Sequence, residues 1–300
     1  MAPAAPDVVL RDVTLRDGLQ IEEPISTAAK LELLEAICAT GVREVEATAF
    51  VSPTKVPALA DAAELCAELT GVAGVRFSGL VASVNGARRA IAAGLGHLEY
   101  VVSAADGHSR ANVGRTSTDS TALIGEIVGV AHESGAQVEV IIATAWDCPF
   151  DGPTPTARVT EIVARAVAAG ADQVALADTI GTTTPRRVTE LVTAVAPMIG
   201  RLPLGAHFHN TRGAGLASAY AAVQAGVRRL DAAAGGLGGC PFAPGASGNI
   251  ALEDLVYLLH DCGIDTGVDL EAAIRAGRVA IGAVGGGAGS ALMRAGDRKR

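Results

Sequence analysis

The chain has 300 residues, of which 49% are hydrophobic and 19% charged, and its formal net charge is −8. An acidic chain without a long basic block, or basic residues interleaved with aromatic ones, does not suit nucleic-acid binding. The sequence also has no apolar segment near the roughly 18 residues that a membrane span needs, and no secretory signal at its start. We therefore expect a soluble, cytoplasmic protein that binds neither nucleic acid nor membrane.

Short apolar runs rich in β-branched residues alternate with segments of helical spacing. The expected strands are residues 8–13, 42–47, 75–81, 97–103, 137–143, 173–177, 204–207 and 229–232. The expected helices are residues 27–40, 57–69, 84–93, 120–134, 155–169, 185–199 and 214–225. Ser26 and Asn85 are placed to cap two of these helices at the start, and glycines such as Gly41 to end them.

Alternation of strand and helix predicts parallel strands. Eight such units match an α/β fold of the closed (β/α)8 TIM-barrel type better than an open doubly wound sheet. Residues 1–270 would form the barrel catalytic domain, followed by a C-terminal helix and a flexible glycine-rich tail at residues 271–300. The glycines of residues 282–289 lack the lysine and the preceding strand of a phosphate loop.

Polar residues follow several of the expected strands, at the barrel end where active sites of this fold lie. They are Arg16, Asp17, Glu46, Asp178, Thr179, His207, His209 and Asn249. Residues two apart on a strand point to the same face, so both histidines can project into the barrel mouth. Barrel closure makes the first, seventh and eighth strands neighbours, so Asp17, His207, His209 and Asn249 can meet.

Two imidazole nitrogens and two side-chain oxygens form a set that can hold a divalent metal ion. Such a set suits an octahedral Mg²⁺ or Mn²⁺ that keeps positions open for water or substrate. Zinc and iron are the alternatives, because two histidines and a carboxylate also form the site of iron oxygenases.

We predict catalytic roles for four residues in addition to the metal ligands. Arg16 can stabilise negative charge on a substrate oxygen, and Glu46 and Asp178 can pair with the cation or metal. Cys240 stands on a glycine-rich loop, which favours an acid or base role over packing. The other cysteines, Cys38, Cys66, Cys148 and Cys262, are expected to be reduced and buried, because an odd number without close pairs does not predict disulfides.

These residues stand in motifs that resemble the 3-hydroxy-3-methylglutaryl-CoA lyase family, whose barrel metalloenzymes are related to isopropylmalate and homocitrate synthases. The resemblance covers most of the chain. The motifs are Arg16 to Gln20, Glu46 to Pro53, Cys148 to Phe150, Asp178 to Gly181, Gly235 to Asn249, and Glu253 to Tyr257.

The resemblance implies metal-assisted cleavage of a carbon–carbon bond in a 3-hydroxyacyl-CoA, which gives an acyl-CoA and a keto acid. Asp17, His207, His209 and Asn249 would hold Mg²⁺ or Mn²⁺, which lowers the pKa of the substrate hydroxyl. Arg16 would stabilise the thioester enolate and Cys240 would protonate it. Asp178 and Glu46 would help proton transfer and orientation, and His207 can also act as acid or base. We also expect a homo-oligomer, a dimer or tetramer.

The sequence departs from the family pattern near the expected substrate site. Arg212 follows the second histidine where the family has a tyrosine, Thr54 precedes Lys55, and Ala233-Ala234 replace a serine and a valine. We assign substrate contacts to Gln20, Thr179 and Arg212, and we expect a different 3-hydroxy-3-substituted acyl-CoA, such as a longer or citramalyl-like one.

Two other functions compete with this one. The first is Claisen condensation of an acyl-CoA with a 2-keto acid, as in isopropylmalate synthases, against which the Gly-Gly-Cys-Pro run and the short chain argue. The second is a noncatalytic barrel that binds acyl-CoA, which predicts scattered losses among the strand-end polar residues.

Overall fold

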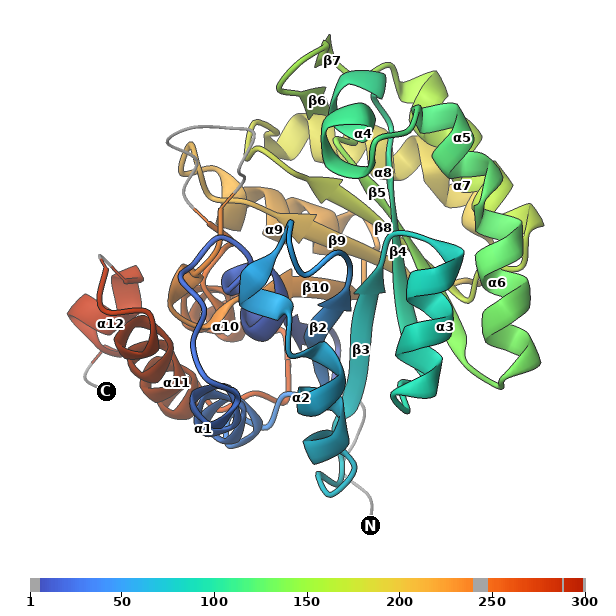
Figure 1. Ribbon diagram of the computed structural model, residues 1–300. Coiled ribbons are helices and arrows are strands. Elements are labelled where there is room, and N and C mark those ends of the chain that lie inside the picture. Colours follow the sequence, from blue (N-terminus) through green and yellow to red (C-terminus); the bar gives the residue numbers. More distant parts are fainter. Residues whose placement is uncertain (1–5, 240–247, 288, 299–300) are drawn as a thin grey trace.

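The computed structural model describes residues 6–239, 248–287 and 289–298. Its parallel strands close into a barrel in the order β1-β10-β9-β8-β5-β4-β3-β2 (Figure 1). The strands are β1 (Val9–Asp12), β2 (Glu44–Phe50), β3 (Arg76–Val81), β4 (His97–Ser103), β5 (Gln137–Ala143), β8 (Gln173–Asp178), β9 (Leu204–Phe208) and β10 (Arg229–Ala232). The predicted (β/α)8 barrel is confirmed, and the open sheet is excluded.

Helices surround the strands on the outside of the barrel (Figure 1). They include α1 (Thr27–Cys38), α2 (Ala62–Leu69), α3 (Val84–Ala92), α6 (Ile124–Glu133), α7 (Thr156–Ala168), α8 (Pro185–Ile199), α9 (Gly215–Gln224) and α10 (Leu252–Asp261). The helix expected at residues 120–134 is two helices, because α5 (Ser117–Ala122) ends before α6 begins. The one expected at residues 57–69 begins as the short 3-10 helix η2 (Pro57–Leu59). No helix among the described residues is long and apolar enough to cross a membrane.

Several elements were not predicted. They are the π-helix η1 (Thr14–Gly18), α4 (Asp106–Val113), the hairpin of β6 (Asp147–Cys148) and β7 (Gly152–Pro153), the 3-10 helix η3 (Ala234–Gly236), α10 and α12 (Ala291–Ala295). The C-terminal helix α11 (Leu270–Ala283) packs against α1, α10 and η3. It contains Gly282, so the helix extends into the start of the glycine-rich stretch.

Local signals at the helix ends agree with the structure in part. The Ser26 hydroxyl accepts a hydrogen bond from the Ala29 amide, as expected of an N-cap. The cap of α3 is Ser83 and not Asn85, since the Ser83 hydroxyl accepts from the Gly86 amide. Gly41 follows α1 with a φ of 87°, which explains its place there.

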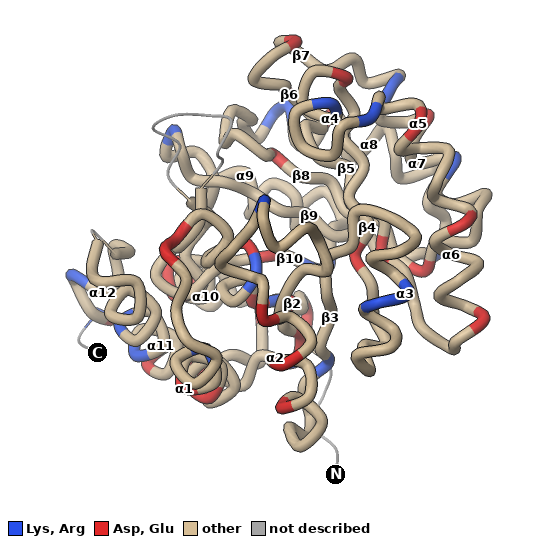
Figure 2. Tube along the Cα trace, viewed as in Figure 1, with Lys and Arg blue, Asp and Glu red and all other residues tan. Residues whose placement is uncertain are grey.

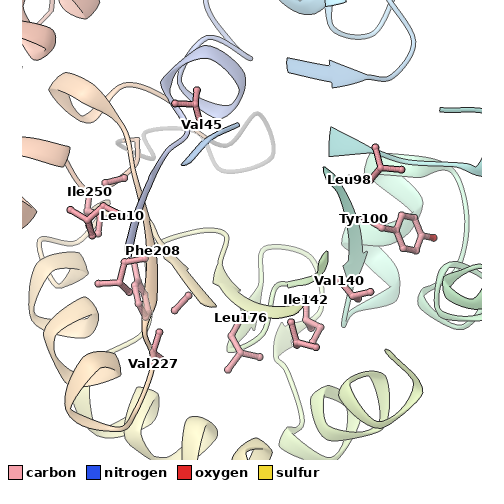
Figure 3. Packing of buried hydrophobic residues seen from close by; sticks show 14 of the residues in the cluster. Leu10, Val45, Leu98, Tyr100, Val140, Ile142, Leu176, Phe208, Val227 and Ile250 are labelled. Carbon is pink, nitrogen blue, oxygen red and sulfur yellow. The ribbon is translucent and has the colours of Figure 1, made fainter. Parts of the chain in front are cut away.

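The main hydrophobic core lies between the strands and the helices. Side chains such as Tyr100, Ile142 and Leu176 point away from the centre of the barrel, toward the helices (Figure 3). Each is nearly inaccessible to solvent, and burying a side chain of this size stabilises the fold by about 1.5–3 kcal/mol. The Tyr100 hydroxyl donates to the Ser120 carbonyl oxygen, so its polar atom also has a partner.

Charged side chains fill much of the inside of the barrel toward its amino end. The Arg11 guanidinium, on β1, lies 2.5 Å from Glu99 on β4, 2.6 Å from Glu139 on β5 and 2.7 Å from Asp231 on β10. All four residues are buried. Figure 2 shows charged segments on the barrel strands as well as on the helices. The strands thus present apolar side chains to the helices and charged side chains to the inside of the barrel. This interior is unusual, because branched aliphatic side chains commonly fill the inside of (β/α)8 barrels.

The described cysteines are unpaired, as expected. Cys66 and Cys148 are buried and Cys38 is half-buried, whereas Cys262 is exposed, so the expectation of burial is wrong for Cys262. It directly follows the end of α10, outside the apolar face of that helix.

A buried hydroxyl ties the barrel strands to the loops that carry the site. Thr14 donates to Asp12 at 3.0 Å and accepts from the Ala234 amide at 2.7 Å, so it joins η1 to η3. Burial raises the pKa of Asp12 to about 7, although the hydrogen bonds from Thr14 lower it. The buried Asp12 carboxyl group therefore depends on the hydrogen bonds that the Thr14 amide and hydroxyl donate to it.

We predict that Thr14→Val lowers the free energy of unfolding by about 1–3 kcal/mol, because it removes both hydrogen bonds from buried groups. Urea denaturation monitored by circular dichroism measures the change. Thr70→Val is the matched control, since the Thr70 hydroxyl is exposed at the end of α2 and bonds only the Ala67 carbonyl. Equal effects of the two substitutions would contradict the prediction.

Candidate active site

A cavity of about 910 Å³ opens at the carboxyl ends of the barrel strands. Its walls come from the ends of β2, β3, β4 and β5, from α3 and α4, and from the loops after β1, β8, β9 and β10. Asp17, His207 and His209 lie on its wall. The cavity therefore lies where the fold predicts an active site.

The π-helix η1 holds Asp17 at the end of β1. The Val13 carbonyl accepts from the amides of Asp17 at 2.8 Å and Gly18 at 3.0 Å, which closes a wide turn directly after the strand. Such π-turns are rare and are often found at functional sites. Here the turn places Asp17 opposite the end of β9.

Asp17, His207 and His209 form a group that could hold a metal ion, with potential ligand atoms all within 4.8 Å of one another. The Nε2 atoms of His207 and His209 lie 3.7 and 3.4 Å from Asp17 Oδ2. All three residues are buried. Burial alone would raise the pKa of Asp17, but the charge of Arg16 and the hydrogen bond from His209 hold it well below its usual range.

Asn249 completes the predicted set. It forms an isolated bridge with His209, and its Nδ2 donates to Asp17 Oδ2 at 2.8 Å and to the Leu237 carbonyl at 2.9 Å. Within the described residues, Asn249 Oδ1 is buried without a hydrogen-bond partner. A buried carbonyl oxygen without a partner is costly, and a divalent cation would satisfy it. Asn249 would therefore join the carboxylate and the two imidazoles through Oδ1, with its amide group turned so that Oδ1 and not Nδ2 faces Asp17.

Arg16 and Glu46 form a buried pair beside this group. Arg16 Nε lies 2.6 Å from Glu46 Oε1, and Arg16 Nη1 lies 2.5 Å from Asp17 Oδ1. Burial would lower the pKa of Arg16, but Glu46 and Asp17 outweigh it and raise the pKa, which keeps the guanidinium charged. Burial raises the pKa of Glu46, against the attraction of Arg16. Arg16 lines the cavity, whereas Glu46 lies behind it.

Asp178 holds the loop after β8. Its two carboxylate oxygens accept from the amides of Thr182 at 3.0 Å and Thr183 at 2.9 Å. Burial raises its pKa, and these hydrogen bonds oppose the rise. Asp178 does not line the cavity, and its hydrogen bonds fix the shape of the loop after β8.

The expected substrate residues separate into two groups. Gln20 and Thr179 line the cavity, and the Thr179 hydroxyl also accepts from the amide of Thr144, a buried residue with a strained φ of 53°. Arg212 does not line the cavity. The residue is exposed, and its guanidinium donates to the carbonyl oxygens of Ile180 and Gly181.

Cys240 lies outside the described residues. The residue before it, Gly239, lines the cavity, so the chain leaves the described part at the cavity wall.

Other residues of the site were not predicted. The cavity wall also carries Lys55, Arg89, Arg115 and His108, whose side chains come from separate loops and helices without a shared motif. Burial lowers the pKa of His108 to about 4, so its imidazole is neutral at pH 7. Asp231 contacts His207 from the neighbouring strand. The available signal for Asp231 was a carboxylate within a short strand that is buried along its whole length.

Comparison with known proteins agrees with this geometry. A family model described as HMGL-like matches residues 7–280. An (R)-citramalyl-CoA lyase of Chloroflexus aurantiacus is 41% identical over 90% of this chain and 88% of its own. A hydroxymethylglutaryl-CoA lyase of Pseudomonas mevalonii is 38% identical over 89% of each chain.

A solved structure that is similar to this chain belongs to the same family of lyases. It is described as an HMG-CoA lyase from Acinetobacter baumannii in complex with coenzyme A and 3-methylmalate, and it matches with a TM-score of 0.92 and 39% identity over 97% of this chain and 95% of its own. These relatives are lyases, so the expectation of a lyase-class enzyme is confirmed. The chain belongs to the HMGL-like family.

Proposed function

We propose that this protein is a divalent-metal-dependent carbon–carbon lyase that cleaves a 3-hydroxy-3-substituted acyl-CoA into an acyl-CoA and a keto acid. The observation that carries the proposal is the buried group of Asp17, His207 and His209 on the wall of a large cavity. The family supports it, since its relatives named above act on CoA thioesters of this type.

The charge of the cavity wall supports an anionic substrate. The wall carries four cationic residues, Arg16, Lys55, Arg89 and Arg115, and a single carboxylate, Asp17, among its described residues. The whole chain, in contrast, has a net charge of −8. Cations gathered in a cleft of an acidic protein attract a negatively charged ligand, and an acyl-CoA carries phosphates and a carboxylate.

Asp17, His207, His209 and Asn249 would hold the metal, which we propose to be Mg²⁺ or Mn²⁺. When bound, the ion polarises the substrate hydroxyl and lowers its pKa. The hydroxyl gives its proton to water in the cavity, the bond between C2 and C3 breaks, and the electron pair of that bond moves onto the thioester to give an enolate, while C3 becomes the keto carbon. Among the residues predicted to move protons, His207 lines the cavity, whereas Glu46 and Asp178 do not.

Arg16 is the residue placed to stabilise the enolate. Its guanidinium is held from behind by Glu46 and from the side by Asp17, and it reaches the cavity wall. A fixed cation at the oxygen where charge develops lowers the barrier by about 3–4 kcal/mol, because it needs no reorganisation during the reaction.

Cys240 is our proposed proton donor to the enolate carbon. The support for this role is that Gly239 lies on the cavity wall and Cys240 follows it in the chain. Protonation of that carbon releases the acyl-CoA.

For the substrate we propose a citramalyl-type thioester in preference to hydroxymethylglutaryl-CoA. One relative is named for citramalyl-CoA, and the Acinetobacter structure holds 3-methylmalate, a hydroxydiacid with the same number of carbons as citramalate. Hydroxymethylglutaryl-CoA differs from citramalyl-CoA by one methylene. Arg212 was expected to set this choice, but it lies away from the cavity wall, so the proposal does not rest on it.

A substrate panel tests the reaction and the choice. With Mg²⁺ or Mn²⁺ we expect kcat/KM for (R)-citramalyl-CoA to exceed that for hydroxymethylglutaryl-CoA by about 10–200-fold, the usual discrimination for one methylene. Release of acetyl-CoA together with pyruvate or acetoacetate measures each reaction. Equal or faster cleavage of hydroxymethylglutaryl-CoA would overturn the choice of substrate. If the protein cleaves none of (R)-citramalyl-CoA, hydroxymethylglutaryl-CoA and 3-methylmalyl-CoA, the proposed lyase activity itself is overturned.

His209→Ala should remove metal binding and activity together, because it deletes one of the nitrogen ligands. Isothermal titration with Mn²⁺ and the lyase assay measure the two effects. His260→Ala is the control, since His260 contacts Thr266 beyond the end of α10, far from the cavity wall. A His209→Ala protein that binds Mn²⁺ as the wild type does would contradict the proposed metal site.

Cys240→Ala should leave Mn²⁺ affinity intact and lower kcat by about two to four orders of magnitude, as expected when a general acid is removed. Cys262→Ala, which removes an exposed thiol outside the cavity wall, should leave kcat unchanged. If Cys240→Ala turns over at the wild-type rate, the thiol is not the proton donor.

A further inference from the structure

We propose that Asp231, held in place by Arg11, is a positioning residue that presets His207 for metal binding. Asp231 would do so by fixing the proton on His207 Nδ1, which leaves the lone pair on Nε2 directed at the site. This inference rests on the proposed metal role of the triad and not on the identity of the substrate.

The register of the barrel places the three residues side by side. Arg11 on β1 is the lateral partner of Asp231 on β10, and Asp231 is the lateral partner of His207 on β9. Lateral partners in parallel strands point to the same side of the sheet. The three side chains therefore form one row across adjacent strands, inside the barrel.

The contacts along this row are direct. Arg11 donates to both oxygens of Asp231, from Nε to Oδ1 at 2.9 Å and from Nη2 to Oδ2 at 2.7 Å. His207 Nδ1 lies 3.1 Å from Asp231 Oδ2. Glu99 and Glu139 hold the far side of the guanidinium, so it cannot turn away from Asp231. A two-point contact of this kind fixes the plane of the carboxylate.

Both Asp231 oxygens already accept from the Arg11 guanidinium, and a carboxylate paired in this way accepts from Nδ1, which places the proton on that nitrogen. An imidazole with its single proton on Nδ1 has its lone pair on Nε2, the atom that lies 3.7 Å from Asp17 Oδ2. Carboxylate partners of this kind orient metal-binding histidines and raise their basicity. Asp231 thus has a role in the site although it does not line the cavity.

The second histidine provides an internal comparison. Within the described residues, His209 Nδ1 is buried without a hydrogen-bond partner. The two histidines therefore differ at Nδ1, where His207 meets the Asp231 carboxylate and His209 has no carboxylate, whereas both approach Asp17 through Nε2. This difference predicts that His207 adopts a single tautomer before any metal binds.

Asp231→Asn tests the role with little change of shape. The asparagine amide can donate to Nδ1 and stabilise the other tautomer, so we expect the Mn²⁺ dissociation constant, measured by titration of metal-free protein, to rise about 10–100-fold. Asp172→Asn is the matched control, because Asp172 also contacts a histidine, His132 at 2.9 Å, but lies at the other end of the barrel. Its Mn²⁺ affinity should equal that of the wild type.

An unchanged Mn²⁺ affinity in folded Asp231→Asn, even with a lower melting temperature, would overturn the inference and leave Asp231 a packing role only. Nitrogen-15 NMR of metal-free wild type provides a second test that does not depend on the folding of Asp231→Asn. With the His207 signals assigned by their loss in His207→Gln, a proton on Nδ1 is expected, and a proton on Nε2 would also overturn it. If metal affinity responds as expected while no acyl-CoA is cleaved, the proposed function fails and this inference stands.

Discussion

The buried guanidinium of Arg11 is the constraint on which the barrel interior depends. It joins β1 to β4, β5 and β10 through three carboxylates, in a region nearly closed to water. Ion pairs in such a place often add little net stability, because desolvation of the charges offsets their attraction. Removal of the cation, however, would take from Glu99, Glu139 and Asp231 the guanidinium that they share, and would leave, as ion-pair partners among the described residues, only Arg229 beside Glu139 and His207 beside Asp231. The cluster therefore acts chiefly against alternative registers, since a shift of any one strand would separate its buried carboxylate from Arg11.

The same register determines the geometry at the mouth of the barrel. His207 lies beside Asp231, and His209, two residues further along, points to the same side at the level of η1. The π-turn after β1 brings Asp17 to both histidines, and Thr14 ties that turn to the loop after β10. A metal site on rigid strand ends keeps its ligands near their working positions, which supports activity without large rearrangement.

The sequence was sufficient to predict what depends on periodicity and closure. Strand and helix alternation predicted the barrel, and closure brought Asp17 to His207 and His209 from opposite ends of the chain. The Arg11–Asp231 contact could not be predicted, since lateral pairing depends on a register that periodicity does not reveal. For Arg212, in contrast, the sequence predicted a contact that the structure does not show. Its position after His209 predicted a place in the substrate site, but its side chain donates to the carbonyl oxygens of the neighbouring loop. Short motifs identify a location along the chain and do not determine the direction of a long side chain.

Charge is distributed differently at the two ends of the barrel interior. Charges at one end hold the strands together, and charges at the other end line the proposed substrate site. At the amino end, the buried cations Arg11 and Arg229 are paired with carboxylates of neighbouring strands, so these charges hold the strands together. At the carboxyl end, cations outnumber the carboxylate on the cavity wall. Arg16 belongs to the second set but is held by Glu46 from behind, as Arg11 is held by its acids. A cation restrained in this way can meet a developing negative charge without moving, whereas Lys55 and Arg89, on the exposed rim, can adapt to a long flexible ligand.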